Sequence, residues 1–189
     1  GWQVVQVEDL IDGDAFFQLL SNRMFPSTIY IRGNTEASLA EDEDIFHSKD
    51  PDIFHELFGH CPLLLDAEYA NLFEKFGQIG LQLDKVQRMF FQRLFWFTFE
   101  TGLVHTPVGL KVYGGSLLSS IKESRYAVDN PLPLRQDFNM IDIFRTSYRA
   151  DLIQSIYYIA LDFSQFLTML DDVNLIKKNI EIAYESGEF

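Results

Sequence analysis

Residues 84–103 read DKVQRMFFQRLFWFTFETGL, the most aromatic segment of this 189-residue chain. If the segment is helical, apolar side chains cover most of its circumference; they include Met89, Phe90, Leu94, Phe97 and Phe99. A helix of this length that is apolar nearly all round belongs in the interior of a protein. The segment therefore predicts a central, buried helix from about residue 84 to residue 103.

Shorter helices are predicted on the N-terminal side of this segment. Asp50-Pro51 favours a helix start, because Asp is a good N-cap and Pro loses no hydrogen bond at the first helical position. This helix would run over residues 51–58 and end at Gly59. Asp66 is expected to cap another helix that ends near Gly77, and an apolar helical stretch covers residues 15–20.

Extended structure is expected in a smaller part of the chain. Residues 2–7 and 25–32 favour strands, and residues 106–116 favour a hairpin or irregular segment because Pro and Gly interrupt them. No internal repeat, linker or composition break divides the sequence. We therefore predict a mainly α fold, with a single helical domain over residues 1–189 and a small amount of β-sheet.

Composition excludes several classes of function. The formal net charge of −13, from 15 basic and 28 acidic residues, disfavours nucleic acid and anionic membranes as partners. Every strongly apolar stretch is interrupted before the roughly 20 residues of a membrane helix. Because Cys61 is the only cysteine and no leader opens the chain, we expect a cytoplasmic protein without an internal disulfide.

The hexapeptide His55-Glu-Leu-Phe-Gly-His60 points to chemistry, since it nearly matches the HExxH zinc motif. On a continuous α-helix, residues five apart point about 140° away from each other, which is too divergent for one ion. Gly59 could end the helix in a left-handed conformation and turn His60 back toward His55. Two packed, hydrogen-bonded histidines are the structural alternative.

Glu100 is the candidate for a third ligand, because an ionised carboxylate among such apolar neighbours must be paired or bind metal. A buried ion pair with Arg or Lys is the alternative. Two imidazoles and one carboxylate suit non-haem Fe(II) with open positions for O₂. The same set on zinc supports hydrolysis, for which Glu56 is the nearby candidate for a general base.

Three separated segments resemble the pterin-dependent aromatic amino acid hydroxylases, with the bacterial phenylalanine 4-hydroxylases as the nearest group. They are residues 50–63 (DPDIFHELFGHCPL), 96–103 (WFTFETGL) and 113–120 (YGGSLLSS). The resemblance starts at Gly1-Trp2 and continues through residues 145–149, so it covers most of the chain. It implies one catalytic domain of this family's fold, and we expect family sequence to be trimmed before Gly1.

The resemblance implies that His55, His60 and Glu100 hold one Fe(II) and act as the catalytic centre. It also implies tetrahydrobiopterin as the two-electron donor, which reacts with O₂ at the iron to give a ferryl oxidant. The implied reaction converts L-phenylalanine to L-tyrosine. The expected partners are therefore the small molecules L-phenylalanine and O₂, and a monomer is compatible with the sequence.

Five positions match the family's substrate-binding residues. Arg32 would grip the substrate carboxylate, a task suited to a planar guanidinium, and Asp52 would buttress it. Ser48 and Ser119 would lie near the amino acid's polar end or behind an iron ligand, and Trp96 would form a wall for the ring. Structural ion pairing, a loop or cap serine, and core packing are the respective alternatives.

Substrate preference follows from two apolar positions. Tryptophan hydroxylases usually have Phe at the position of Trp96, so the resemblance disfavours an indole substrate. Ile159 stands where tyrosine hydroxylases tend to have an acid, so the resemblance favours phenylalanine over tyrosine. Ser120 and Glu123 are weaker site candidates. A tyrosine-hydroxylating relative, a His₂Glu zinc hydrolase and a non-catalytic acidic helical binding module are the alternative functions.

The resemblance also assigns the pterin site. Phe16 would stack on the pterin, Leu10 and Ile11 would lie on the adjoining backbone, and Glu56 would reach the ring through water. The chain departs from the family at three positions, where Asp9, Thr101 and Ser116 replace common Gly, Phe and Gly. These departures affect the expected pterin geometry more than the expected iron site.

Overall fold

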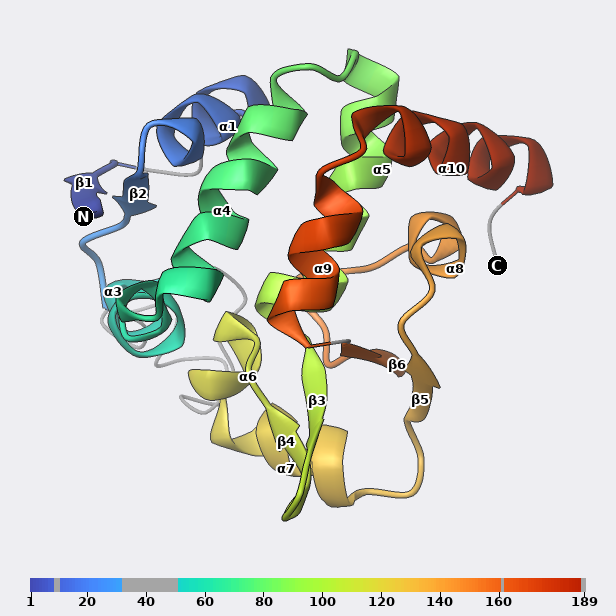
Figure 1. Ribbon diagram of the computed structural model, residues 1–189. Coiled ribbons are helices and arrows are strands. Elements are labelled where there is room, and N and C mark those ends of the chain that lie inside the picture. The colour runs from blue at the N-terminus through green and yellow to red at the C-terminus, as the bar shows by residue number, and fades with distance from the viewer. Residues whose placement is uncertain (9–10, 32–50, 161, 188–189) are drawn as a thin grey trace.

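The computed structural model describes residues 1–8, 11–31, 51–160 and 162–187, and helices dominate this part of the chain (Figure 1). The longer helices are α1 Gly13–Ser21, α4 Ala67–Gly80, α5 Lys85–Phe95, α7 Ile121–Asp129, α9 Phe163–Leu170 and α10 Val173–Ser186. The shorter ones are α3 Ile53–His55, η1 Glu56–His60, η2 Leu63–Leu65, η3 Trp96–Glu100, α6 Gly115–Leu118 and α8 Met140–Arg145. The predicted mainly α fold is confirmed.

Two small sheets complete the described fold. Strands β1 Gln3–Gln6 and β2 Met24–Ser27 pair in parallel. The second sheet has the order β4-β3-β6-β5, and its strands are β3 Leu103–Thr106, β4 Gly109–Val112, β5 Leu134–Asp137 and β6 Ile156–Ala160. The antiparallel pair β3/β4 confirms the expected hairpin, which starts slightly earlier than the sequence predicted.

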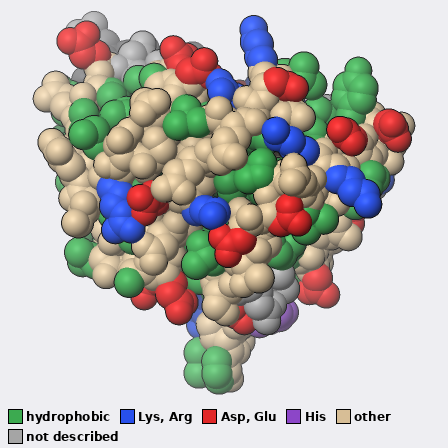
Figure 2. All heavy atoms as spheres, turned by 45° about the horizontal axis from the view of Figure 1, so that its top comes forward, with side chains coloured by type: hydrophobic (Ala, Val, Ile, Leu, Met, Phe, Trp, Pro, Cys, Tyr) green, Lys and Arg blue, Asp and Glu red, His purple; other side chains and the backbone are tan. Residues whose placement is uncertain are grey.

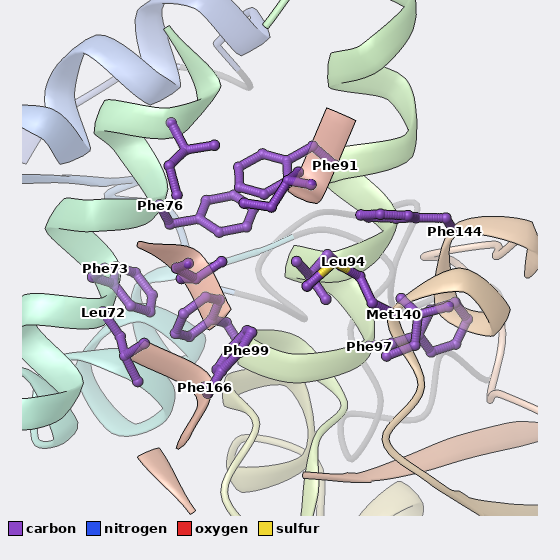
Figure 3. Packing of buried hydrophobic residues seen from close by; sticks show 14 of the residues in the cluster. Leu72, Phe73, Phe76, Phe91, Leu94, Phe97, Phe99, Met140, Phe144 and Phe166 are labelled. Atoms are coloured by element: carbon purple, nitrogen blue, oxygen red, sulfur yellow. The ribbon is translucent and has the colours of Figure 1, made fainter. Parts of the chain in front are cut away.

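The core lies where α4, α5 and α9 meet, above the second sheet in Figure 1. Figure 3 shows Phe76 of α4 and Phe91 of α5 lying ring against ring, with centroids 4.0 Å apart and planes inclined by 9°. Phe73 meets Phe99 edge to face at 4.5 Å, and Phe166 of α9 lies beside Phe99. Offset and edge-on ring contacts of this kind add to the free energy gained by burial.

The predicted helix over residues 84–103 is divided in two. Asp84 caps α5 in a reciprocal capping box with Gln87, and the helix then continues into the π-helical turn η3 before Thr101 ends it. The expectation of burial all round is wrong for α5, because Met89 is 57% exposed. The expectation of burial is confirmed for residues 97–100 of η3, which are all buried.

The predicted helix over residues 51–58 also differs. Asp52, not Asp50, caps α3, and its carboxylate accepts the His55 backbone N–H at 2.9 Å; Asp50 lies outside the described residues. Gly59 does not end the helix in a left-handed conformation, since it lies inside the π-helical turn η1. Glycine is needed there for space, because a Cβ would lie 2.6 Å from the Gly115 carbonyl oxygen.

The helix α4 does not end at Gly77, and close packing against another helix explains why this residue is a glycine. The helix begins at the predicted cap, Asp66, whose carboxylate accepts the Glu68 and Tyr69 N–H groups, but it runs on to Gly80. A Cβ on Gly77 would lie 2.4 Å from the backbone nitrogen of Ser21. This glycine therefore lets α1 approach α4, the two helices that lie side by side at the left of Figure 1.

On the face shown in Figure 2, acidic, basic and apolar side chains of the described residues are interspersed. Among the helices of the described residues, none combines the length and apolarity needed to cross a membrane.

Candidate active site

The two histidines of the hexapeptide meet because η1 is a π-helical turn. Its defining hydrogen bond runs from the Cys61 N–H to the Glu56 carbonyl oxygen at 3.0 Å, so it spans five residues instead of four. Residues five apart are therefore stacked, and Nε2 of His55 lies 2.9 Å from Nε2 of His60. The sequence anticipated this convergence but assigned it to the wrong backbone feature.

Glu100 reaches the same point from a second π-helical turn, η3. The Thr101 N–H donates to the Trp96 carbonyl oxygen at 2.9 Å, which again spans five residues. One carboxylate oxygen, Oε1, lies 3.2 Å from His60 Nε2, and the other, Oε2, lies 3.6 Å from His55 Nε2. In the described part of the chain, Glu100 thus contacts imidazoles where an ordinary buried ion pair would have Arg or Lys.

These separations fit a single metal ion. Two ligand atoms about 2.1 Å from an ion and at right angles to each other are about 3.0 Å apart. The 2.9 Å between the two ring nitrogens and the 3.2 Å from His60 Nε2 to Glu100 Oε1 are close to this value, and the other oxygen, Oε2, lies 3.6 Å from His55 Nε2. All three side chains are buried, and their nitrogen and oxygen donors match a facial set that leaves positions open.

Glu56 is a second carboxylate near the histidines. One of its oxygens lies within 4.8 Å of a ring nitrogen of each histidine, so His55, Glu56 and His60 could also hold an ion. Burial raises the pKa of Glu56 from 4.5 to about 7, against the lowering effect of His60. In Glu100, by contrast, His60 and His55 overcome the effect of burial and lower the pKa to about 2. Of these two carboxylates, Glu100 is therefore the one held ionised beside the histidines.

The raised pKa of Glu56 has a measurable consequence in chelator-treated protein. Because the folded chain binds the Glu56 proton more tightly than the unfolded chain, stability falls as the pH rises through 7. Between about pH 5.5 and about pH 8, wild type should lose about 2 kcal/mol relative to Glu56→Gln. Urea unfolding of both proteins in EDTA measures this difference, and parallel pH dependences would contradict the assignment.

The helical turn α6 and its C-cap residue, Ser119, contact all three candidate ligands. A Cβ on Gly115 would lie 2.4 Å from His60 Cε1, so the glycine backbone packs directly on that ring. Ser116 Oγ donates to Glu100 Oε2 at 2.9 Å. Ser119 Oγ lies 3.0 Å from His55 Nδ1 and donates to the Gly115 carbonyl oxygen at 2.9 Å. Ser119 can therefore accept the Nδ1–H of His55, and in that tautomer Nε2 carries the lone pair that a metal ligand needs.

A cavity of about 190 Å³ lies beside the candidate ligands. Its lining brings together six residues predicted from the sequence: Ile11, Phe16, His55, Glu56, His60 and Glu100. Phe16 meets Phe95 edge to face at 5.2 Å, so aromatic rings form part of the wall. The candidate metal ligands and most of the candidate pterin residues thus share one space.

Other predicted site residues have different surroundings. Trp96 stacks on Tyr148, with ring centroids 4.6 Å apart and planes inclined by 9°, and it does not line this cavity. Asp52 is fully buried at the N-cap of α3. Ser120 caps α7, and Glu123 accepts hydrogen bonds from the Tyr157 hydroxyl and the Gln154 backbone. Three predicted residues lie outside the described residues, namely Leu10, Arg32 and Ser48.

Sequence reasoning missed three residues around the site. Phe25 packs 5.2 Å from the His60 ring, and the Thr28 backbone forms a hydrogen bond with Glu56. Ser116 was noted only as a departure from the family, although it contacts Glu100. Ser116 lies in segment 113–120, which resembles the family and so could have indicated that this residue is near the site. A sequence alone, however, does not show which side chain of that segment faces the ligands.

Comparison with known proteins identifies the family of this chain. The family model described as biopterin-dependent aromatic amino acid hydroxylase matches residues 1–187. Phenylalanine-4-hydroxylase of Pseudomonas aeruginosa is 39% identical over 172 residues, which are 91% of this chain and 62% of that protein. The chain thus spans less than two thirds of this curated relative.

Solved structures give the same family. The apo structure of the cold active phenylalanine hydroxylase from Colwellia psychrerythraea 34H is 40% identical, with a TM-score of 0.89, and the match covers 100% of this chain and 70% of that one. Phenylalanine hydroxylase from Chromobacterium violaceum bound to cobalt is 35% identical, with a TM-score of 0.83, over 95% of this chain and 63% of that one. Our chain belongs to the biopterin-dependent aromatic amino acid hydroxylases.

Proposed function

We propose that this chain hydroxylates L-phenylalanine to L-tyrosine with O₂ and a tetrahydropterin, at a non-haem Fe(II) held by His55, His60 and Glu100. The observation that carries the proposal is the meeting of these three side chains, at 2.9–3.6 Å, beside the cavity that contains Phe16. Both solved structures compared above are phenylalanine hydroxylases, which favours phenylalanine over tyrosine as the substrate.

Iron and the tetrahydropterin would together supply the electrons and the O₂ chemistry that no side chain can provide. In a monooxygenase reaction of this kind, one oxygen atom of O₂ would enter the substrate ring and the other would pass to the pterin. The chain itself would hold and shield the reactants. His55, His60 and Glu100 would fix the ion from one side, and the buried walls of the cavity would exclude water.

The cofactor-binding residues in this proposal are Leu10, Ile11, Phe16 and Glu56. Phe16 would pack against the pterin, since its ring lines the cavity together with Phe95. Glu56 lines the same space as the ligands and is buried among them. For the substrate, we assign Arg32 to the carboxylate, with Asp52 beside it, and keep Ser48, Trp96 and Ser119 as its further neighbours.

An omission series tests the proposed function. The metal-stripped protein is reconstituted anaerobically with Fe(II), tetrahydropterin and phenylalanine, O₂ is admitted, and the amino acids are analysed by mass spectrometry. Tyrosine should form only when all four components are present. Tyrosine formed without pterin, or no tyrosine from protein with verified iron, would contradict the proposal. Parallel reactions with L-tyrosine and with zinc test the tyrosine-hydroxylating and hydrolytic alternatives.

The Phe16→Leu variant tests the pterin wall. Losing an aromatic contact costs about 1 kcal/mol, so the KM for tetrahydropterin should rise about fivefold while the KM for phenylalanine changes little. Initial rates at varied concentrations of each substrate measure both constants. Phe90→Leu is the matched control, because Phe90 packs near Tyr184 and does not line the cavity. An unchanged pterin KM in Phe16→Leu would remove this residue from the pterin site.

A further inference from the structure

The side chain of Ser116, in α6, hydrogen-bonds to the candidate carboxylate ligand. Its hydroxyl donates at 2.9 Å to Glu100 Oε2, the oxygen that lies 3.6 Å from His55 Nε2. The other oxygen, Oε1, lies closer to a histidine nitrogen, at 3.2 Å from His60 Nε2. A hydrogen bond to an ionised carboxylate is about twice as strong as one between neutral groups. The Ser116 hydrogen bond can therefore fix the orientation of the Glu100 carboxylate.

The backbone around Ser116 gives this contact little freedom. Gly114 lies directly against the Glu100 backbone, where a Cβ would be 2.3 Å from the carbonyl oxygen, and Gly115 lies against the His60 ring. The α6 turn is thus held in place between the two π-helical turns. Because Ser116 directly follows these two glycines, its hydroxyl is carried at a fixed position beside Glu100.

We propose that Ser116 is a positioning residue of the metal centre, whose hydroxyl holds Glu100 Oε2 and leaves Oε1 as the oxygen that faces the ion. This inference rests on the proposed metal centre. Without the Ser116 hydroxyl, Oε2 loses its donor in a buried site, and the carboxylate is free to rotate and present both oxygens. The expected consequence is a change in the number and strength of the metal ligands, as occurs when outer hydrogen-bond partners are removed.

Cobalt(II) is a suitable probe, because its visible absorption depends on the number and geometry of its ligands and can be read without turnover. Chelator-treated wild type, Ser116→Ala, Ser116→Thr and Ser124→Ala are titrated with Co(II). Ser116→Ala should bind Co(II) about tenfold more weakly and with an altered absorption spectrum. Ser116→Thr keeps the hydroxyl and should restore both properties.

Ser124→Ala is the matched control, because Ser124 also donates to the α6 segment, at the Leu117 carbonyl oxygen, but does not contact Glu100. It should resemble wild type. If Ser116→Ala fails to fold, Ser116→Gly also removes the hydroxyl and is judged by the same criteria.

The outcomes separate the two proposals. The metal centre itself would be contradicted if the wild type did not bind one Co(II) per chain. It would also be contradicted if the His55→Ala variant bound Co(II) as tightly as the wild type. Wild type with a His55-dependent site, together with a Ser116→Ala spectrum and affinity within twofold of wild type, would overturn only the role of Ser116. Failure of Ser116→Thr to restore the wild-type spectrum would also overturn it.

Discussion

Glu100→Gln is expected to lose iron and turnover together. The amide is nearly isosteric with the carboxylate, but its oxygen is neutral and cannot balance the charge of Fe(II). Glu100 is the proposed third ligand of the ion. Its replacement should therefore lower the Fe(II) affinity by more than about 100-fold, which is the upper end of the loss seen when a hydrogen-bond partner of a metal ligand is removed. Iron content after dialysis, with kcat measured at saturating pterin and phenylalanine, gives the two readouts.

Glu56→Gln is the matched control for this experiment, since it makes the same change in the other buried carboxylate near the histidines. It should retain iron. The reverse result, with iron lost in Glu56→Gln and kept in Glu100→Gln, would show that Glu56 is the third ligand. Far-UV circular dichroism of both variants separates loss of a ligand from loss of the fold.

Gly114→Ala is expected to have the second largest effect. The added Cβ would lie 2.3 Å from the Glu100 carbonyl oxygen and 2.6 Å from the Gly102 nitrogen, and neither backbone atom can move without displacing η3. Overpacking of a tight interior typically costs about 1–3 kcal/mol, and a backbone contact belongs at the upper end of that range. The same displacement should move Glu100 and weaken iron binding by more than about tenfold.

Thermal unfolding and iron titration check this expectation. Gly13→Ala is the control, because the Cβ there would meet only the amide end of the Gln92 side chain, at 2.9 Å, which can rotate away. It should unfold near the wild-type temperature and bind iron normally. A Gly114→Ala protein with wild-type stability and iron affinity would show that α6 and η3 are not packed as described.

The candidate ligands could be predicted from the sequence because their chemistry is local. Buried helices are normally apolar, because an unpaired polar or charged side chain is costly to bury. His55, His60 and Glu100 depart from that pattern, and so they stand out in the sequence. The π-helical turns could not be predicted. A hydrogen bond that spans five residues in place of four leaves no distinct composition, so the convergence of His55 and His60 was assigned to a left-handed Gly59.

The remaining differences arise from contacts between segments far apart in the sequence. Gly59 and Gly77 read as helix ends, but each is a glycine because another backbone lies against it, that of Gly115 or of Ser21. Ser116 contacts Glu100 from sixteen residues away, and that register is set by the packing of α6. Likewise, the exposed face of α5 depends on where the neighbouring helices stop covering it.

The origin of the oxygen atom tests the central claim most directly. Protein with verified Fe(II) and tetrahydropterin is given unlabelled phenylalanine in unlabelled water under ¹⁸O₂, and the tyrosine is analysed by mass spectrometry. A pterin-dependent monooxygenase predicts tyrosine that carries one ¹⁸O atom. Tyrosine without ¹⁸O, or no tyrosine at all, would contradict the proposed function.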